Sequence, residues 1–375
     1  MLGAPGQVHT CRFTSTPKKN MKRIVLIIAV LLFCALGYLL LFPVPITPAA
    51  WTPPVAPTLT GDYAQNNRLA NVQQLSLGEG HHPEDVALDA SGNIYGGFDD
   101  GRIIQLKADG TEPRLFANTG GRPLGLVFDR DGNLIVTDAI KGLLLVDKNG
   151  AVKTLATEAD GAQFGCLNDL DVAADGTIYF TEASNKFPMS KFAYDILEHQ
   201  PNGRFLAYDP KTQQTRTILN GIYFANGVAV SPDQSYVLVC ETGLYRVIKI
   251  WLTGAKQGQH EVFIDNLPGF PDGISSNGKD KFWLALVTPR DNLLDNVLLP
   301  RPFTRKIVLR LPTFMRPAPK RYSFVLGLNA EGKVVDNLQN GTPDCYAEIA
   351  NVVERDGALY FGSIAESAVG KFVLK

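Results

Sequence analysis

Four oxygen-bearing side chains each lie the same number of residues before a large apolar residue in the sequence. Two are carboxylates and two are amides: Glu84, Asn168, Asn226 and Asp272. Each is followed eleven residues later by a member of a strand-like segment: Tyr95, Tyr179, Val237 and Trp283. Carboxylate and amide oxygens suit hard cations, above all Ca²⁺. No His or Cys takes an equivalent position, which argues against zinc. The spacing therefore predicts a site for Ca²⁺, or another divalent cation, built from these four residues.

Ordinary turn chemistry is the alternative interpretation of the same residues. Asn, Asp and Gly before a strand are common turn residues, and Pro-Glu-Asp, Ala-Asn-Gly and Pro-Asp-Gly here fit that use. One such match carries no weight. Four oxygen donors in the same phase favour the metal site.

Neighbouring residues supply candidates for the remaining chemistry. Asp272 is predicted as a ligand and as a catalytic residue. Either a water activated by the metal or by a carboxylate attacks the substrate, or Asp272 attacks as the nucleophile, and both alternatives stay open. His82 is a candidate general base. His81 and Asp169 are expected just behind the ligands. A solvated His pair on a loop is the alternative for His81 and His82. No G-x-S-x-G motif supports a serine hydrolase.

An internal repeat shows which elements position these residues. An apolar strand, a small polar turn and a second apolar strand recur six times: DVALDASGNIYGGF, LGLVFDRDGNLIVTD, LDVAADGTIYFTE, GVAVSPDQSYVLVCE, GISSNGKDKFWLAL and VVERDGALYFGS. A further strand ending at a turn follows each copy. The sequence thus predicts an all-β, six-bladed propeller over residues 71–375. A sandwich does not explain six copies in phase.

The propeller brings the predicted ligands together, because they precede innermost strands that converge on the central channel. The other two blades carry Leu124 and Ile349 at this phase. Residues 71–77 are strand-like and are expected to complete the last blade. Acidic residues that end second strands are expected to point away from this mouth: Asp138, Glu182 and Glu241.

Two insertions interrupt the repeats, at residues 183–201 and 288–320. Both follow a second strand, so both are expected on one face, where they would roof the pocket. The second is apolar and rich in Leu, Pro and Phe. It is expected either to cover the substrate or to rest on a membrane.

The N-terminal region predicts a membrane anchor. Residues 24–42 contain no charge, and at about 1.5 Å per residue they nearly cross a bilayer core of roughly 30 Å. Lys18, Lys19, Lys22 and Arg23 precede them, which predicts a type II, single-pass protein. Residues 1–23 are then cytoplasmic, residues 43–70 form a Pro-rich linker, and the propeller is non-cytoplasmic. A cleaved signal peptide is the alternative.

Composition limits the other functions. The 36 Lys and Arg residues balance 37 Asp and Glu residues, so no nucleic-acid partner is expected. The five cysteines form no C-x-x-C pair. Cys166, Cys240 and Cys345 are expected as buried thiols, and a Cys166–Cys345 disulfide stays open as an alternative.

Several stretches resemble the adipocyte plasma membrane-associated protein group, a branch of the strictosidine-synthase-like propellers. They include GRPLGLVFDRDGNLIVTDAIKGLLLVD, LNDLDVAADGTIYFTEAS, FANGVAVSPDQSYVLVCET, LPGFPDGI and KRYSFVLGL. The wider superfamily includes calcium-dependent lactonases, arylesterases and phosphotriesterases. The resemblance implies that Glu84, Asn168, Asn226 and Asp272 are metal ligands. The glutamate with which strictosidine synthase binds its amine is replaced by Ala350, with Glu348 nearby, which argues against a condensing enzyme.

These observations together predict a membrane-anchored, calcium-dependent hydrolase of esters or lactones. Its substrate would be a small molecule whose carbonyl oxygen the cation polarises. A non-catalytic binding propeller with a structural metal is the alternative, because a fold does not fix a function.

Overall fold

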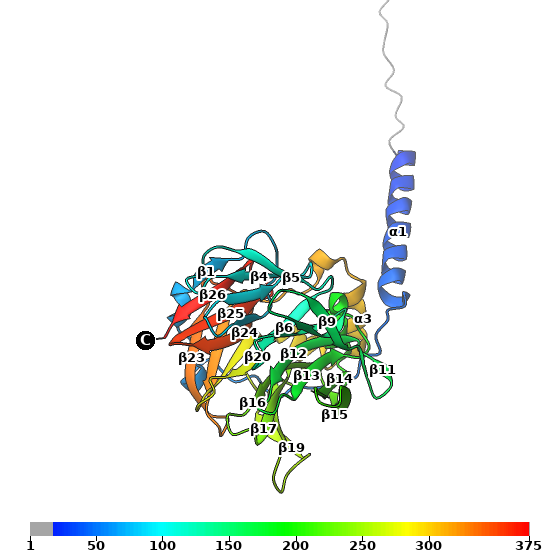
Figure 1. Cartoon of the computed structure of the whole chain (residues 1–375). Coiled ribbons are helices and arrows are strands. Elements are labelled where there is room, and N and C mark those ends of the chain that lie inside the picture. Colours follow the sequence, from blue (N-terminus) through cyan, green and yellow to red (C-terminus); the bar gives the residue numbers. More distant parts are fainter. Residues whose placement is uncertain (1–17, 375) are drawn as a thin grey trace, which may run out of the picture. The chain divides into compact units, whose positions relative to one another are not determined.

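Six antiparallel sheets of four strands are present in residues 18–374, the range that this computed structural model describes (Figure 1). In five of these sheets the chain runs in order from the innermost to the outermost strand. The predicted six-bladed β-propeller is therefore confirmed, and each blade matches one copy of the repeat.

The first three blades each use four consecutive strands of one sheet. Blade one contains β2 (Val86–Leu88), β3 (Ile94–Gly97), β4 (Arg102–Leu106) and β5 (Arg114–Asn118). Blade two contains β6 (Pro123–Phe128), β7 (Leu134–Asp138), β8 (Gly142–Val146) and β9 (Val152–Ala156). Blade three contains β12 (Cys166–Val172), β13 (Ile178–Ser184), β14 (Gly203–Asp209) and β15 (Gln214–Ile222). A short hairpin of β10 (Glu158–Ala159) and β11 (Ala162–Gln163) joins blades two and three.

The last three blades repeat this plan. Blade four contains β16 (Ala225–Val230), β17 (Tyr236–Glu241), β18 (Arg246–Trp251) and β19 (His260–Ile264), with the short helix η4 (Thr242–Leu244). Blade five contains β20 (Gly269–Ser276), β21 (Phe282–Pro289), β22 (Ser323–Leu328) and β23 (Val334–Asn340). Blade six contains β24 (Ile349–Arg355), β25 (Ala358–Ser363) and β26 (Ala368–Val373).

An N-terminal strand supplies the outer edge of blade six. β1 (Gln73–Ser76) pairs antiparallel with β26, from Gln73 opposite Lys371 to Ser76 opposite Ala368. The expectation for residues 71–77 is confirmed. The pairing closes the ring, because it joins a strand from the start of the fold to the end of the chain.

The middle strands are buried on both faces. All residues of β7 and β17 are buried, and adjacent blades cover their two sides. Such strands appear in the sequence as continuous apolar runs and not as strict alternation. Polar turns separate them. In the turn after β6, the Asp129 carboxylate accepts the Asn133 main-chain N–H at 2.8 Å, and Gly132 takes a φ of 78°. Glycine adopts this left-handed conformation without steric cost.

Most of the predicted Pro-rich linker, residues 43–70, packs against the propeller. Residues 46–59, here called the strap, belong to the same compact unit as the blades. The Ala49 N–H donates to the carbonyl of Glu198, and the Trp51 N–H donates to the carbonyl of Leu299. The Trp51 ring stacks on His199 with 4.3 Å between ring centroids. η1 (Gly61–Tyr63) and η2 (Arg68–Asn71) then lead into β1. From Ile46 onward this segment is therefore part of the folded unit.

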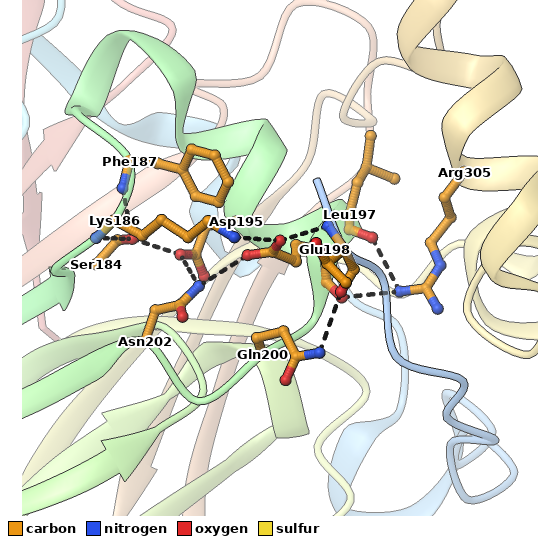
Figure 2. A network of polar contacts seen from close by, with 10 residues as sticks. Ser184, Lys186, Phe187, Asp195, Leu197, Glu198, Gln200, Asn202 and Arg305 are labelled. Atoms are coloured by element: carbon orange, nitrogen blue, oxygen red, sulfur yellow. Dashed lines mark hydrogen bonds and ion pairs between the residues drawn. The ribbon is translucent and has the colours of Figure 1, made fainter. Parts of the chain in front are cut away.

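The two insertions form short helices and contact each other. The first holds η3 (Met189–Lys191) and α2 (Phe192–Glu198), and the second holds η5 (Leu294–Leu298), α3 (Pro302–Arg310) and η6 (Thr313–Met315). Figure 2 shows Arg305 of the second insertion donating to the Leu197 carbonyl at 2.9 Å. Arg305 also bonds to the strap at the Ala49 carbonyl. The Glu198 carboxylate accepts the Thr47 N–H at 2.6 Å, so both insertions hold the strap.

A second compact unit contains α1 (Lys18–Leu41) together with Lys306–Arg316. An 18-residue stretch within Met21–Leu41 of α1 has a mean hydropathy of 3.1 and is not buried. This helix is long and apolar enough to cross a membrane.

Candidate metal centre

The four predicted ligands meet in one small pocket. Glu84, Asn168, Asn226 and Asp272 are only 5–6% exposed, although all four are polar. The pocket has six further lining residues: Asp85, Leu124, Asp169, Gly273, Ala350 and Asn351. The structure therefore brings together donors that lie up to 188 residues apart in the sequence, because four different blades contribute them.

Irregular pairing at the start of the inner strands positions these side chains. The register between inner and second strands shifts between Leu167 and Leu170 in blade three, a span that contains Asn168. Equivalent shifts enclose Asn226 in blade four and Asp272 in blade five. A β-bulge turns a side chain away from the regular alternation of a strand. The ligand positions thus point into the channel mouth, although they lie within or beside strands.

Buried carboxylates give the pocket a strong negative character. Burial raises the pKa of Asp272 well above its usual range, and the nearby Glu84 charge raises it further. Burial also raises the pKa of Glu84, while Arg122, whose Nη2 lies 3.3 Å from Glu84 Oε2, opposes the rise. Sequence reasoning missed Arg122, whose Nη1 is buried without a hydrogen-bond partner. A cation between Glu84 and Asp272 would compensate their charges.

Asp169, predicted behind the ligands, lies in the pocket wall and links two blades. Its Oδ2 accepts the Val228 N–H of blade four at 3.0 Å. Asp85, which sequence reasoning missed, makes the matching bond to the Leu126 N–H of blade two at 2.6 Å. Burial raises the pKa of Asp85 to about 7. Both carboxylates directly follow a predicted ligand, so they fix the inner strands on which the ligands stand.

Three buried threonines hold the ligand segments from the preceding blade. Thr137 Oγ1 donates to the Asn168 carbonyl at 2.5 Å, and Thr181 Oγ1 donates to the Asn226 carbonyl at 2.7 Å. Thr242 Oγ1 donates to the Pro271 carbonyl, next to Asp272, at 2.6 Å. Blades two, three and four therefore each position the ligand segment of the next blade. Thr137 and Thr181 each precede an acid of the second strand, which was the available sequence signal, whereas Thr242 lies in η4 after its strand.

The acids that end second strands lie at the pocket end of the blades, so the expectation that they point away was wrong. Glu182 pairs with Leu167, the residue before Asn168, and Glu241 pairs with Ala225, the residue before Asn226. In an antiparallel hairpin, the end of the second strand adjoins the start of the first. The Glu182 carboxylate accepts the Gly165 N–H at 2.6 Å. The Glu241 carboxylate accepts the Tyr223 main-chain N–H at 2.9 Å. The Asp138 carboxylate accepts the Arg122 main-chain N–H, also at 2.9 Å. All three hold the loops that enter the inner strands.

The predicted general base lies outside the pocket. The His82 side chain is 45% exposed, and its Nδ1 is 3.3 Å from Asp99 Oδ2. His81 is exposed beside it, with 5.9 Å between the ring centroids. The two residues precede Pro83 in a loop, which turns their side chains away from the channel although Glu84 is buried in it. The structure therefore does not bring His81 or His82 to the ligands.

Two other expectations are resolved at the edge of the site. Ala350, and not Ile349, lines the pocket, since the register of β24 shifts between Ile349 and Asn351. Glu348 is not among the lining residues, so the described pocket wall has no carboxylate from blade six. Neither insertion contributes a lining residue in the described chain, so neither closes over the ligands as a roof.

The donor set itself limits the choice of metal. Within residues 18–374, no group of three His, Cys, Asp or Glu side chains is placed to hold a metal ion. The candidate centre has two carboxylates and two amides, a composition that fits a hard cation such as Ca²⁺ and not zinc. The sulfur atoms are also separate: Cys166 and Cys345 are buried free thiols, so the alternative of a disulfide between them was wrong.

Comparison with known proteins agrees with the fold and gives the family. Family models described as strictosidine synthase-like, N-terminal, and strictosidine synthase match residues 61–106 and 168–255. Protein STRICTOSIDINE SYNTHASE-LIKE 6 of Arabidopsis thaliana is 36% identical over 80% of this chain and 81% of its own length. The adipocyte plasma membrane-associated protein of Rattus norvegicus is 30% identical over 91% of this chain and 96% of its own.

Solved structures show the same fold at low identity. A gluconolactonase of Xanthomonas campestris superposes with a TM-score of 0.59 at 18% identity, covering 88% of this chain and 99% of its own. The calcium-binding protein regucalcin of Agrobacterium tumefaciens gives a TM-score of 0.56 at 14% identity, over 80% and 93% of the two chains. Because relatives of 30% identity or more cover most of its length, the chain belongs to the strictosidine synthase-like family of β-propeller proteins.

Proposed function

We propose that this protein is a calcium-dependent hydrolase of small esters or lactones. The main support is the convergence of Glu84, Asn168, Asn226 and Asp272 from four blades on one buried pocket. Ca²⁺ takes about six to eight oxygen ligands, so four protein donors leave positions for water and a substrate oxygen. The fold is also that of a gluconolactonase and of a calcium-binding protein.

A cation held by these ligands would supply Lewis acidity to a substrate carbonyl oxygen. The side chains of this chain set the rest of the environment. Asp272 is the candidate nucleophile or water-orienting base, since its carboxylate lines the pocket. Arg122 opposes the charge of Glu84 from beside the pocket. Leu124 and Ala350 form the apolar part of the wall.

A non-catalytic propeller with a structural cation is the second candidate. One observation favours it: the space among the lining residues has room for about one water molecule, far less than a small-molecule substrate occupies. A condensing enzyme has less support, because Ala350 replaces the glutamate that such an enzyme is expected to carry.

Activity and cation binding should be measured on the same purified full chain. Phenyl acetate and a panel of lactones are offered with calcium, with chelator, and to the Asp272→Ala and Asn226→Ala variants. A hydrolase predicts turnover that chelation and both substitutions abolish. Turnover that ignores chelation and substitution would contradict the proposal. Calcium binding by calorimetry without turnover on any substrate would favour the structural cation.

We also propose that α1 crosses a membrane once and leaves the propeller on the non-cytoplasmic side. Its apolar stretch and the basic residues before it support this orientation. Protease digestion of sealed microsomes should leave the propeller protected. A mature N-terminus after residue 45 would show instead that the helix is a cleaved signal.

A further inference from the structure

An arginine of the second insertion caps the end of the candidate membrane helix. Arg310 Nε donates to the Phe42 carbonyl at 2.6 Å, and its Nη1 donates to the Leu39 carbonyl at 2.7 Å. The last carbonyls of a helix have no partner within it, and at the end of a membrane span they need one. A cation there also complements the helix dipole. Residues 306–316 are thus bonded to the terminus of α1.

This segment carries positive charge without compensation from its own acids. Residues 306–316 read KIVLRLPTFMR, with three basic residues and no acidic one. The Arg316 guanidinium bonds to the carbonyls of Leu309 and Leu311 at 2.8 and 2.9 Å, as Arg310 bonds to carbonyls of α1. Carbonyl oxygens satisfy these donors but leave a full positive charge on each side chain.

The tip of the segment presents large apolar side chains to the surroundings. Phe314 is 87% exposed and Met315 is 56% exposed, both within the turn η6. Phe314 is among the most exposed large apolar residues in the described chain. Tyr38, near the end of α1, is 46% exposed and its ring lies 4.9 Å from that of Phe42. Aromatic residues at this level are typical of a membrane–water interface.

We propose that Phe314 and Met315 insert into the headgroup region of the phospholipid membrane beside α1. Lys306, Arg310 and Arg316 then lie at the level of the lipid phosphates, whose charge is opposite to theirs. The bonds from Arg310 to α1 fix this depth, because the same guanidinium marks where the apolar helix ends. This inference rests on the proposed membrane crossing of α1 and is independent of the proposed hydrolysis.

Tryptophan quenching by lipids can test the insertion in the full chain. The protein is placed, one copy per nanodisc, in phosphatidylcholine with or without brominated acyl chains. Three single substitutions at exposed apolar positions are compared with the unsubstituted chain: Phe314→Trp, Leu32→Trp within α1 and Val262→Trp on β19. Bromine quenches only a tryptophan that touches lipid. We expect Phe314→Trp and Leu32→Trp to lose roughly half of their added emission, and Val262→Trp to lose none.

The controls separate failure of the tip from failure of the anchor. Quenching at Leu32→Trp without quenching at Phe314→Trp would overturn the insertion and leave the anchor in place. A blue-shifted but unquenched Phe314→Trp would also overturn it, since protein would then cover the tip. If Leu32→Trp is unquenched too, the anchor fails and the insertion fails with it. None of these outcomes bears on hydrolysis, which the chelation assay tests.

Discussion

Four blades carry an oxygen donor at the ligand position of the channel mouth, whereas blades two and six carry Leu124 and Ala350 at that position. The inner strands of blades two and six shift register around these residues, as those of blades three, four and five do around their donors. The shift is therefore shared by five blades, and the side chain at this position decides whether a blade can contribute a ligand. The fold supplies six equivalent positions, and the sequence uses four of them for donors.

The largest expected effect concerns the ion pairs that support the mouth. Glu182→Ala leaves the 8% exposed side chain of Arg204 without its carboxylate partner, so the free energy of unfolding should fall by about 3–5 kcal/mol. Glu241→Ala is the matched control, because its partner Arg246 is 31% exposed and water can solvate it. Urea unfolding measures both. Equal losses would contradict the role assigned to burial.

Removing a donor should affect the cation more than the fold. Asp272→Ala should weaken calcium binding by at least ~100-fold, given that changes to groups behind metal ligands already cost roughly 10–100-fold. Asp272→Asn keeps an oxygen donor and should lose less. Calorimetric titration measures both variants. Unchanged affinity in Asp272→Ala would remove this blade from the donor group.

A smaller effect is expected from the threonines that hold a donor from the neighbouring blade. Thr181→Val keeps the shape but removes the bond to the Asn226 carbonyl, so calcium affinity should fall by about 10-fold. The loss should appear in the dissociation constant with the far-ultraviolet circular dichroism unchanged. A Thr181→Ser variant restores the hydroxyl and should recover most of the affinity.

The pH dependence should show that the buried carboxylates need a cation. The pKa of Asp85 is about 7 in the fold, above its usual 3.8. Between pH 3.8 and pH 7 the metal-free folded chain therefore binds more protons than the unfolded chain. That contribution favours the fold at low pH, and it is lost as pH rises toward 7. Calcium should therefore raise the melting temperature more at pH 8 than at pH 5, by at least ~2 °C. Thermal unfolding with chelator or calcium measures it. A larger calcium effect at pH 5 would contradict this.

The smallest effect is expected from placing an oxygen donor at the ligand position of a blade that carries an apolar residue there. Leu124→Asn puts an amide of similar size on the bulge of blade two, next to the other ligands. Calcium affinity should rise by a factor of a few, roughly 3-fold, because one more oxygen is offered at a modest desolvation cost. Leu124→Met is the size-matched control and should change nothing. Weaker binding in Leu124→Asn would show that the two groups of blades are not equivalent.

The sequence by itself determined the propeller, the closure by residues 71–77 and the four polar residues that share a pocket. These features follow from local patterns repeated in phase, and a repeat of strands and turns leaves few ways to arrange six hairpins around an axis. Glu84, Asn168, Asn226 and Asp272 were found because each stands at the same place in its copy.

Only the tertiary structure decided what surrounds those residues. The contacts of Arg122, Asp85 and Thr181 cross between blades, and no spacing within one copy predicts a bond to the next. The same holds for His82, which is two residues from Glu84 in the sequence, although its side chain lies beside Asp99. Arg310 reaches the end of α1 across more than 260 residues of sequence. Side-chain direction and long-range contacts depend on how the blades pack, whereas strands and turns follow from short patterns of neighbouring residues in the sequence.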